Sequence, residues 1–232
     1  MTDVSRERFA RRYPPLPAPD FGAAHTALVV VDVQYGDAHP DYGLLKQLRD
    51  RGDGDITTYY AQRLSEQVLP NIRALQDACR RAGIEVIHVG IQSMTQDGRD
   101  RSREHKNANF HFAPGSKEAA FVEDVAPQGD ELVFTKTCSG VFNGTNIDYV
   151  LHNMEMKTLI FCGVFTNGCV ESAVRDAADR SYQAVMIDDA CAAWTEELHR
   201  NSVNVLNGVY ATVLSTEDML AAIEGGATAA KS

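Results

Sequence analysis

The stretch that decides the fold is Thr158-Leu-Ile-Phe-Cys-Gly-Val-Phe-Thr-Asn-Gly-Cys-Val-Glu-Ser-Ala-Val-Arg-Asp-Ala177. Its apolar run from Leu159 to Phe165 predicts a buried strand, and after a short polar turn apolar residues recur at helical spacing. Cys169 therefore lies in the first turn of a helix that directly follows a strand. Backbone N–H groups at a helix start carry partial positive charge, which favours a thiolate and suits the oxyanion of an acyl-transfer reaction. The alternative is that Cys169 only packs as a small apolar side chain.

Strands and helices alternate along most of the chain. The expected strands are near-continuous apolar runs, at Ala27–Val33, Glu85–Ile91, Glu131–Lys136, Thr158–Phe165, Gln183–Asp188 and Ala211–Ser215. The expected helices are Thr58–Ala82, Asn146–Asn153, Val170–Arg180, Thr195–Asn207 and Glu217–Ile223. This alternation predicts an α/β sandwich, in which functional groups gather beyond the carboxyl ends of the strands.

The length of 232 residues suits one domain with a single large core. We expect an irregular, proline-rich N-terminal arm over residues 1–24, one domain over 25–224 and a flexible tail over 225–232. No stretch is apolar for long enough to span a bilayer, and the arm lacks the apolar core of a signal peptide. The sequence therefore predicts a cytoplasmic protein.

The formal net charge of −10 argues against nucleic acid and against an anionic membrane as partners. A small-molecule substrate is the expected partner. The five cysteines are scattered and form no C-x-x-C pair, which favours reduced thiols over a disulfide framework or a zinc site.

Charged side chains stand at the ends of two predicted strands. Asp32 follows an otherwise apolar run, where an unpaired carboxylate would be costly to bury, and Lys136 ends the third strand. Because the carboxyl ends of parallel strands share one edge of a sheet, Asp32, Lys136 and Cys169 could converge there as base, cation and nucleophile. The alternative is a buried Asp32–Lys136 ion pair that only stabilises the fold.

Three motifs in order resemble those of the isochorismatase-like cysteine hydrolases. They are Val31-Asp-Val-Gln34, Thr135-Lys-Thr-Cys-Ser-Gly-Val-Phe142 and Gly163-Val-Phe-Thr-Asn-Gly-Cys-Val-Glu-Ser172. The superfamily includes nicotinamidases, N-carbamoylsarcosine amidohydrolases, biuret hydrolases and ureidoacrylate amidohydrolases. The resemblance extends over about residues 25–223.

The resemblance implies a three-layer α/β/α sandwich around a six-stranded, mainly parallel sheet, with a catalytic triad at its edge. Cys169 would attack an amide or ureido carbonyl, Asp32 would accept the thiol proton, and Lys136 would hold Asp32 and stabilise the thiolate. A thioester-type intermediate would form with loss of ammonia or an amine, and water would hydrolyse it. The oxyanion hole would consist of the backbone N–H groups of Phe165 and Cys169, with a non-proline cis peptide bond between Val164 and Phe165.

The sequence departs from the nicotinamidases in the region that holds their metal. Those enzymes carry an Asp-x-His pair and a further histidine, whereas residues 88–97 contain a single histidine, His88. The seven histidines of the chain form no H-x-H or H-E-x-x-H pattern. We therefore expect no metal and no other cofactor.

A basic cluster follows the second strand, within residues 97–109. Arg101, His105 and Lys106 are its candidates for binding a substrate carboxylate, and relatives that act on ureido acids have a comparable His-Lys stretch. The alternative is a solvated surface loop. Other candidate pocket walls at strand ends are Tyr35, Gln92, Phe142, Asn143 and Asn167.

These observations predict a metal-free amidohydrolase that cleaves a C–N bond of a small amide, ureido or carbamoyl compound. One alternative is a thiol-based redox enzyme, which would require a resolving cysteine, and the nearest, Cys162, points into the sheet. Another is a catalytically silent binding member of the fold. The resemblance further implies a homodimer or homotetramer.

Overall fold

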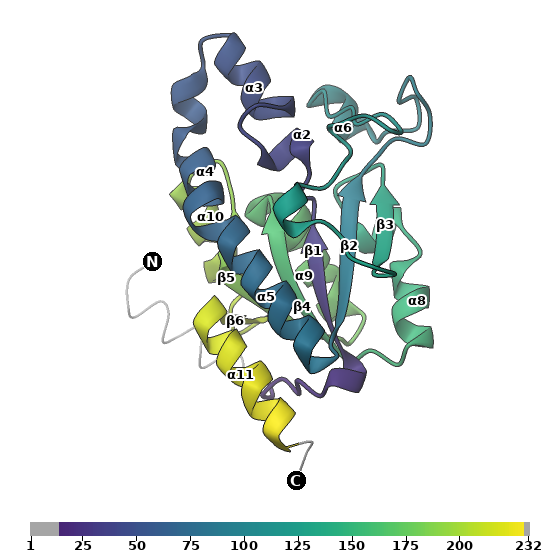
Figure 1. Ribbon diagram of the computed structural model, residues 1–232, viewed down its shortest axis with the longest axis vertical. Helices are drawn as coiled ribbons and strands as arrows, with labels where there is room; N and C mark the ends of the chain where they lie inside the picture. The colour runs from purple at the N-terminus through teal and green to yellow at the C-terminus, as the bar shows by residue number, and fades with distance from the viewer. Residues whose placement is uncertain (1–13, 230–232) are drawn as a thin grey trace.

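The computed structural model describes residues 14–229, and a six-stranded sheet lies at its centre (Figure 1). The strand order is β3-β2-β1-β4-β5-β6, and every neighbouring pair is parallel. The strands are β1 (Thr26–Val31), β2 (Glu85–Ile91), β3 (Leu132–Lys136), β4 (Thr158–Val164), β5 (Gln183–Ala192) and β6 (Thr212–Leu214). Each overlaps a strand expected from the sequence, so the prediction of six strands in a parallel arrangement is confirmed.

Helices connect the strands on both faces of the sheet. The α-helices of the described residues are α2 (Tyr35–Ala38), α3 (Gly43–Asp50), α4 (Thr58–Arg63), α5 (Leu69–Ala82), α6 (Arg103–Asn107), α7 (Val141–Gly144), α8 (Ile147–Asn153), α9 (Glu171–Asp179), α10 (Glu196–Leu206) and α11 (Thr216–Ala229). Two π-helical turns are η3 (Leu64–Val68) and η5 (Thr166–Val170), and three short 3-10 turns are η1 (Ala23–His25), η2 (Gly54–Thr57) and η4 (Glu123–Val125).

The long helix expected over residues 58–82 is continuous, but its middle turn is the π-helical η3. Gly83 ends it in a left-handed conformation with φ +72°, which a residue without a Cβ adopts readily. The short helices α2, α3, α6 and α7 were not expected from the sequence.

The central strand shows why the apolar runs are continuous. Leu28 and Val30 of β1 belong to a core that also contains side chains of α5 and α11. Val29 and Val31 belong to the opposite core, together with side chains of α8, α9 and α10. Because successive side chains of a strand point to opposite faces, a strand covered on both sides is apolar at every position. The three-layer α/β/α sandwich is therefore confirmed.

The described part of the N-terminal arm packs on its own chain. The backbone N–H of Asp20 donates to Gln183 Oε1 at 3.0 Å, and its carbonyl accepts from Thr158 Oγ1 at 2.7 Å. At the other end, α11 continues to Ala229, beyond the expected domain end at residue 224. The remainder of the expected arm, residues 1–13, and of the expected tail, residues 230–232, lies outside the described residues.

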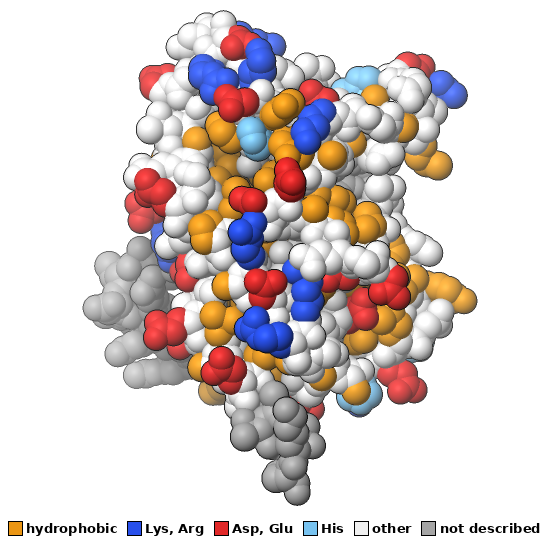
Figure 2. Space-filling model, in the orientation of Figure 1, with side chains coloured by type: hydrophobic (Ala, Val, Ile, Leu, Met, Phe, Trp, Pro, Cys, Tyr) orange, Lys and Arg blue, Asp and Glu red, His pale blue; other side chains and the backbone are white. Residues whose placement is uncertain are grey.

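The surface carries charges of both signs. In Figure 2, acidic and basic side chains are interspersed over the visible face. Nucleic-acid-binding surfaces instead gather basic side chains on one face. The mixed charges support the expectation that nucleic acid is not a partner, which stays a prediction. Of the helices in residues 14–229, none combines the length and the apolar character that a bilayer crossing requires.

Candidate active site

Three strand ends meet at the carboxyl edge of the sheet. Lys136 is the last residue of β3, Asp32 directly follows β1, and Cys169 lies in η5 between β4 and α9. The backbone N–H of Asp32 donates to the carbonyl of Val89 in β2 at 2.8 Å, which extends the sheet by one residue. The elbow expected between strand and helix at Cys169 is present.

The Lys136 ammonium joins the three side chains. Its Nζ donates to Asp32 Oδ2 at 2.8 Å, to the Cys138 carbonyl at 3.1 Å and to Cys169 Sγ at 3.3 Å. All three N–H bonds of the ammonium therefore have an acceptor. Asp32 Oδ1 has no hydrogen-bond partner among the described residues, so this oxygen is available to accept a proton.

The site is almost fully removed from solvent. Lys136 is 0% exposed, Asp32 1% and Cys169 6%. Burial raises the pKa of Cys169, the negative charge of Asp32 raises it further, and Lys136 offsets only part of this rise. Burial alone would lower the pKa of Lys136, but Asp32 and Cys169 outweigh it and the pKa is raised. The raised pKa favours the neutral thiol, which agrees with the expected role of Asp32 as the group that accepts its proton.

Unusual backbone geometry positions these groups. Asp32 has φ +55°, a left-handed conformation that few non-glycine residues other than Asn and Asp adopt. Gly163 has φ +118°, and a Cβ there would lie 2.1 Å from the carbonyl oxygen of Val31. The Val164–Phe165 peptide bond is cis, as the family resemblance implied. The carbonyl of Phe165 accepts hydrogen bonds from two backbone N–H groups of η5, at 3.0 and 3.2 Å.

A buried polar chain lies behind the turn that carries Cys169. Thr166 Oγ1 lies 2.8 Å from His199 Nδ1, and His199 Nε2 lies 2.6 Å from Asp188 Oδ1. Burial lowers the pKa of His199, so the ring is neutral. His199 Nε2 lies between Asp188 Oδ1 and Arg63 Nη2, which is 3.0 Å away, and Nδ1 faces the Thr166 hydroxyl, which can donate or accept.

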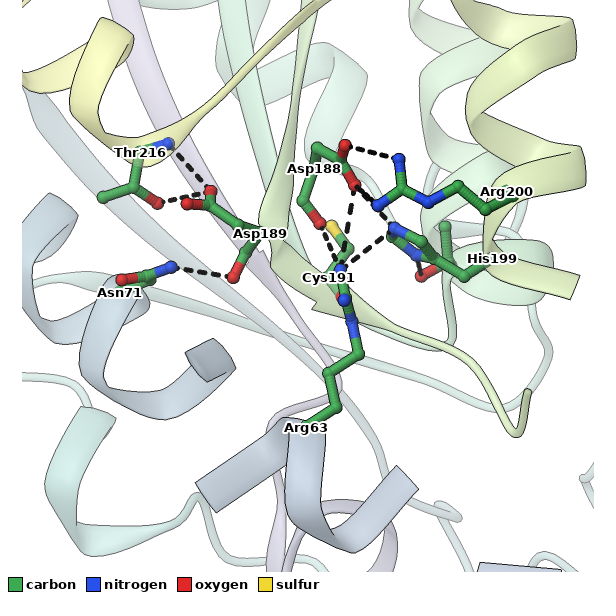
Figure 3. A network of polar contacts seen from close by, with 9 residues as sticks. Arg63, Asn71, Asp188, Asp189, Cys191, His199, Arg200 and Thr216 are labelled. Carbon is green, nitrogen blue, oxygen red and sulfur yellow. Dashed lines mark hydrogen bonds and ion pairs between the residues drawn. The ribbon is translucent and has the colours of Figure 1, made fainter. Parts of the chain in front are cut away.

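Two arginines complete this network (Figure 3). Arg63 donates to the carbonyls of Asp188 and Cys191, both at 2.9 Å, and Arg200 donates to both carboxylate oxygens of Asp188 at 2.8 and 3.0 Å. Burial raises the pKa of Asp188, but the hydrogen bonds from His199 and Arg200 outweigh it and hold the pKa at about 2. The network thus ties the helix α4, the end of β5 and the helix α10 to the turn at Thr166.

Sequence reasoning missed this network, although part of it left a signal. His199 is spaced with Val203 and Leu206 at helical intervals on the buried face of α10, so its burial followed from the pattern. Its contact with Thr166, thirty-three residues away in sequence, could not be read from the pattern.

We expect Thr166→Val to lower kcat by about tenfold, because it leaves His199 Nδ1 unpaired and removes a hydrogen bond that holds the turn. Thr166→Ser keeps the hydroxyl and is the matched control, with kcat close to that of the parent. The measurement is steady-state kinetics on the substrate found by the screen described below. Equal kcat in the valine and serine variants would show that the hydroxyl does not position the turn.

The basic loop is placed beside the site, but its long side chains contact the loop itself. Arg101 donates to the carbonyls of Gly98 and Phe110 at 2.9 and 2.7 Å, and Lys106 donates to the carbonyl of Arg99 at 2.7 Å. The same contacts would have to break or be shared for either cation to bind a carboxylate. The carboxylate-binding role of this loop stays a prediction.

His105 differs from its neighbours because it is buried, with 1% of its surface exposed. Burial lowers its pKa, and the positive charge of Lys136 lowers it further, which places His105 within the electrostatic reach of the triad. Its Nδ1 has no partner among the described residues. The substrate-binding role of His105 stays a prediction.

The other candidate wall residues are distributed around the strand ends. Tyr35 is buried, with the Lys117 ammonium 3.4 Å from the centre of its ring. Phe142 packs against Tyr182 and the Arg180 guanidinium, in the core on the far side of the sheet from α5. The remaining three are exposed or half-buried, namely Gln92, Asn143 and Asn167.

No group of three or more His, Cys, Asp or Glu side chains within residues 14–229 is arranged to hold a metal ion. His88, the single histidine of the region that binds metal in nicotinamidases, is buried with Nε2 3.3 Å from Glu131 and 3.4 Å from Gln76. These contacts assign His88 to the core.

The geometry agrees with three comparisons. The family model of the isochorismatase domain matches residues 26–218. The chain belongs to the isochorismatase family. It is 31% identical over 190 residues to the ureidoacrylate amidohydrolase RutB of Rhizobium rhizogenes, across 72% of this chain and 70% of that protein. It is similar in structure to a cysteine hydrolase from Pseudomonas syringae pv. phaseolicola, with a TM-score of 0.76, 26% identity and coverage of 92% of this chain and 98% of that one.

An uncharacterized isochorismatase family protein of Bacillus subtilis, YddQ, is 29% identical over 205 residues, across 84% of this chain and 98% of that protein. Membership of the isochorismatase family makes this protein a hydrolase, and the prediction of an enzyme is confirmed.

Proposed function

We propose that this hydrolase cleaves the C–N bond of a small amide, ureido or carbamoyl compound with Cys169 as the nucleophile. The observation that supports this most directly is the position of the Lys136 ammonium, within hydrogen-bond distance of both Asp32 Oδ2 and Cys169 Sγ. A carboxylate, an ammonium and a thiol held together in a dry site provide a base, a charge stabiliser and a nucleophile.

The proposed first step joins attack to proton transfer. The neutral Cys169 thiol gives its proton to Asp32 Oδ1 while its sulfur attacks the substrate carbonyl carbon. Lys136 stabilises the negative charge that develops on the sulfur as the proton leaves. The backbone N–H groups of Phe165 and Cys169 are the proposed oxyanion hole. The proton on Asp32 then moves to the departing nitrogen, and ammonia or an amine leaves behind a thioester-type intermediate.

Water completes the proposed reaction. The deprotonated Asp32 carboxylate accepts a proton from a water molecule while the water oxygen attacks the thioester carbon. The Cys169 thiolate leaves and takes that proton back from Asp32. The same carboxylate thus acts twice as a base and twice as an acid, so one titrating group near the nucleophile is sufficient. The similarity to a ureidoacrylate amidohydrolase supports amide or ureide substrates for this chemistry.

The experiment is a screen for ammonia release from matched neutral and acidic compounds. It contains simple amides, nicotinamide and biuret on the neutral side, and N-carbamoyl amino acids and ureido acids on the acidic side. Preference for acidic ureides that is lost when Lys106 or Arg101 is neutralised would support the carboxylate-binding role of the loop. No release from any compound would contradict the proposed reaction and favour a silent binding member of the fold.

A thiol-exchange function receives no support from Cys162, the cysteine nearest to Cys169 in sequence. The five cysteines are all free, and Cys162 belongs to the core on the opposite face of the sheet from Cys169. Cys162 therefore cannot resolve a disulfide at Cys169 without unfolding β4. The proposed setting of the enzyme is the cytoplasm, where such thiols stay reduced, and its proposed assembly is a homodimer or homotetramer, which sedimentation would test.

We expect prolonged chelation to leave kcat unchanged, because backbone N–H groups and Lys136 can stabilise the developing charges without a Lewis acid. The measurement is the rate of ammonia release before and after dialysis against a strong chelator, with metal content determined on the same samples. Activity that falls on chelation and returns with added zinc, iron or manganese would contradict this expectation.

A further inference from the structure

Asp37 is a second buried carboxyl group close to the triad. It lies in α2, five residues after Asp32, and only 2% of its surface is exposed. Its Oδ1 has no hydrogen-bond partner among the described residues. A buried polar atom without a partner destabilises the folded state, so such a group in a native protein calls for an explanation.

Asp37 follows the end of β1 at the carboxyl edge of the sheet, and Tyr60 connects it to the segment that precedes the nucleophile. Tyr60 Oη donates to the backbone carbonyl of Asp37 at 2.8 Å, and the Tyr60 ring lies 5.0 Å from the ring of Phe165, centre to centre. Phe165 directly precedes the turn η5 that carries Cys169. These contacts connect Asp37 to the turn of the nucleophile through Tyr60 and Phe165.

The charge balance of the site favours the protonated form of Asp37. The groups that interact with it electrostatically are Asp32 beyond β1, Lys136 on β3, Tyr60 on α4 and Cys169 in η5. Lys136 is the single cation among them, and it is already paired with Asp32. Burial raises the pKa of Asp37 well above its ordinary value, the charge of Asp32 raises it further, and Lys136 offsets only part of the rise.

We propose that Asp37 is a substrate-binding residue, whose neutral carboxylic acid hydrogen-bonds to the amide or ureido group held against Cys169. A protonated carboxyl has one donor and one acceptor, which complement the carbonyl oxygen and the N–H of such a group. This inference rests on the proposed function and extends it to the substrate. The part of the substrate that lies beside Asp37 is uncharged, because a carboxylate there would face Asp32 as well.

The test compares Asp37→Leu with Asp37→Asn on the best substrate of the screen. Leucine removes both hydrogen bonds, and we expect kcat/KM to fall by about tenfold or more. Asparagine keeps a donor and an acceptor, and the expected fall is no more than about threefold. Leucine also removes the unpaired buried polar atom, so Asp37→Leu is expected to melt at a higher temperature than the parent.

The pH dependence of melting supplies a readout that does not depend on turnover. The folded protein binds the Asp37 proton more tightly than the unfolded chain, so the parent loses stability as the pH rises from the ordinary value of 3.8 towards the raised pKa. Asparagine does not titrate. The difference in melting temperature between Asp37→Asn and the parent therefore grows in favour of the variant as the pH is raised.

Gln76→Leu is the matched control for replacing a buried polar side chain by leucine. Gln76 is 1% exposed and donates to the carbonyl of Val125 at 3.0 Å, away from the site, so its loss should lower the melting temperature and leave kcat/KM unchanged. The inference is overturned if Asp37→Leu behaves like this control, or if Asp37→Asn is as impaired as Asp37→Leu, which would make the ionised carboxylate the functional form. A parent enzyme without turnover on any compound would instead defeat the proposed function, and this inference with it.

Discussion

Cys169→Ala is expected to lower kcat/KM by at least about 10³-fold while the protein stays folded, because among the described residues Cys169 Sγ is the nucleophilic atom to which the Lys136 ammonium donates. Cys169→Ser should be nearly as inactive. A serine hydroxyl is a far weaker acid than a thiol, and a carboxylate such as Asp32 does not activate it. The measurement is ammonia release under single-turnover conditions, where a small contamination by parent enzyme is easily recognised.

Cys79→Ala is the control for removing a buried thiol. Cys79 is fully buried in the core between the sheet and α5, so its loss should reduce stability and leave kcat/KM unchanged. Mass spectrometry of the parent, quenched during turnover, should find the acyl group on the peptide that contains Cys169. Full activity of Cys169→Ala would contradict the proposed mechanism whatever the stability of the variant.

Much of the fold could be predicted from the sequence because the strands are buried on both faces. In β4, for example, residues 159–162 are all apolar and fully buried. The short helices α2 and α7 could not be predicted, since four residues contain little more than one turn and no periodicity. They form where the chain turns away from a strand end, and tertiary contacts rather than propensity decide their conformation.

The part of the candidate site that could be predicted is the set of side chains at three strand ends. The convergence of Asp32, Lys136 and Cys169 follows from the rule that parallel strands share one edge, and the distances agree with it. The raised pKa of the thiol could not be predicted, because it depends on burial by elements far apart in sequence. The same holds for Asp37, which in sequence is one of many acids and becomes distinct only through its lack of a partner.

Replacing Lys136 by methionine is expected to lower the free energy of unfolding by about 3–5 kcal/mol, because Asp32 is then left as an unpaired buried charge. Activity should be lost as well. Lys46→Met is the matched control, since Lys46 and Asp50 form an exposed ion pair and its loss should leave the free energy of unfolding nearly unchanged. Both variants are measured by urea denaturation.

The double variant Asp32→Leu/Lys136→Met separates stability from catalysis. Removing both charges leaves no unpaired ion, so its free energy of unfolding should recover to that of the parent or exceed it by about 1–4 kcal/mol. Turnover should stay absent, because the double variant has neither a base nor a charge stabiliser for Cys169. Recovery of stability without recovery of activity would mean that the pair is retained for chemistry. If the double variant is as unstable as Lys136→Met, the ion pair itself holds the strand ends together, and its presence in the site would not argue for catalysis.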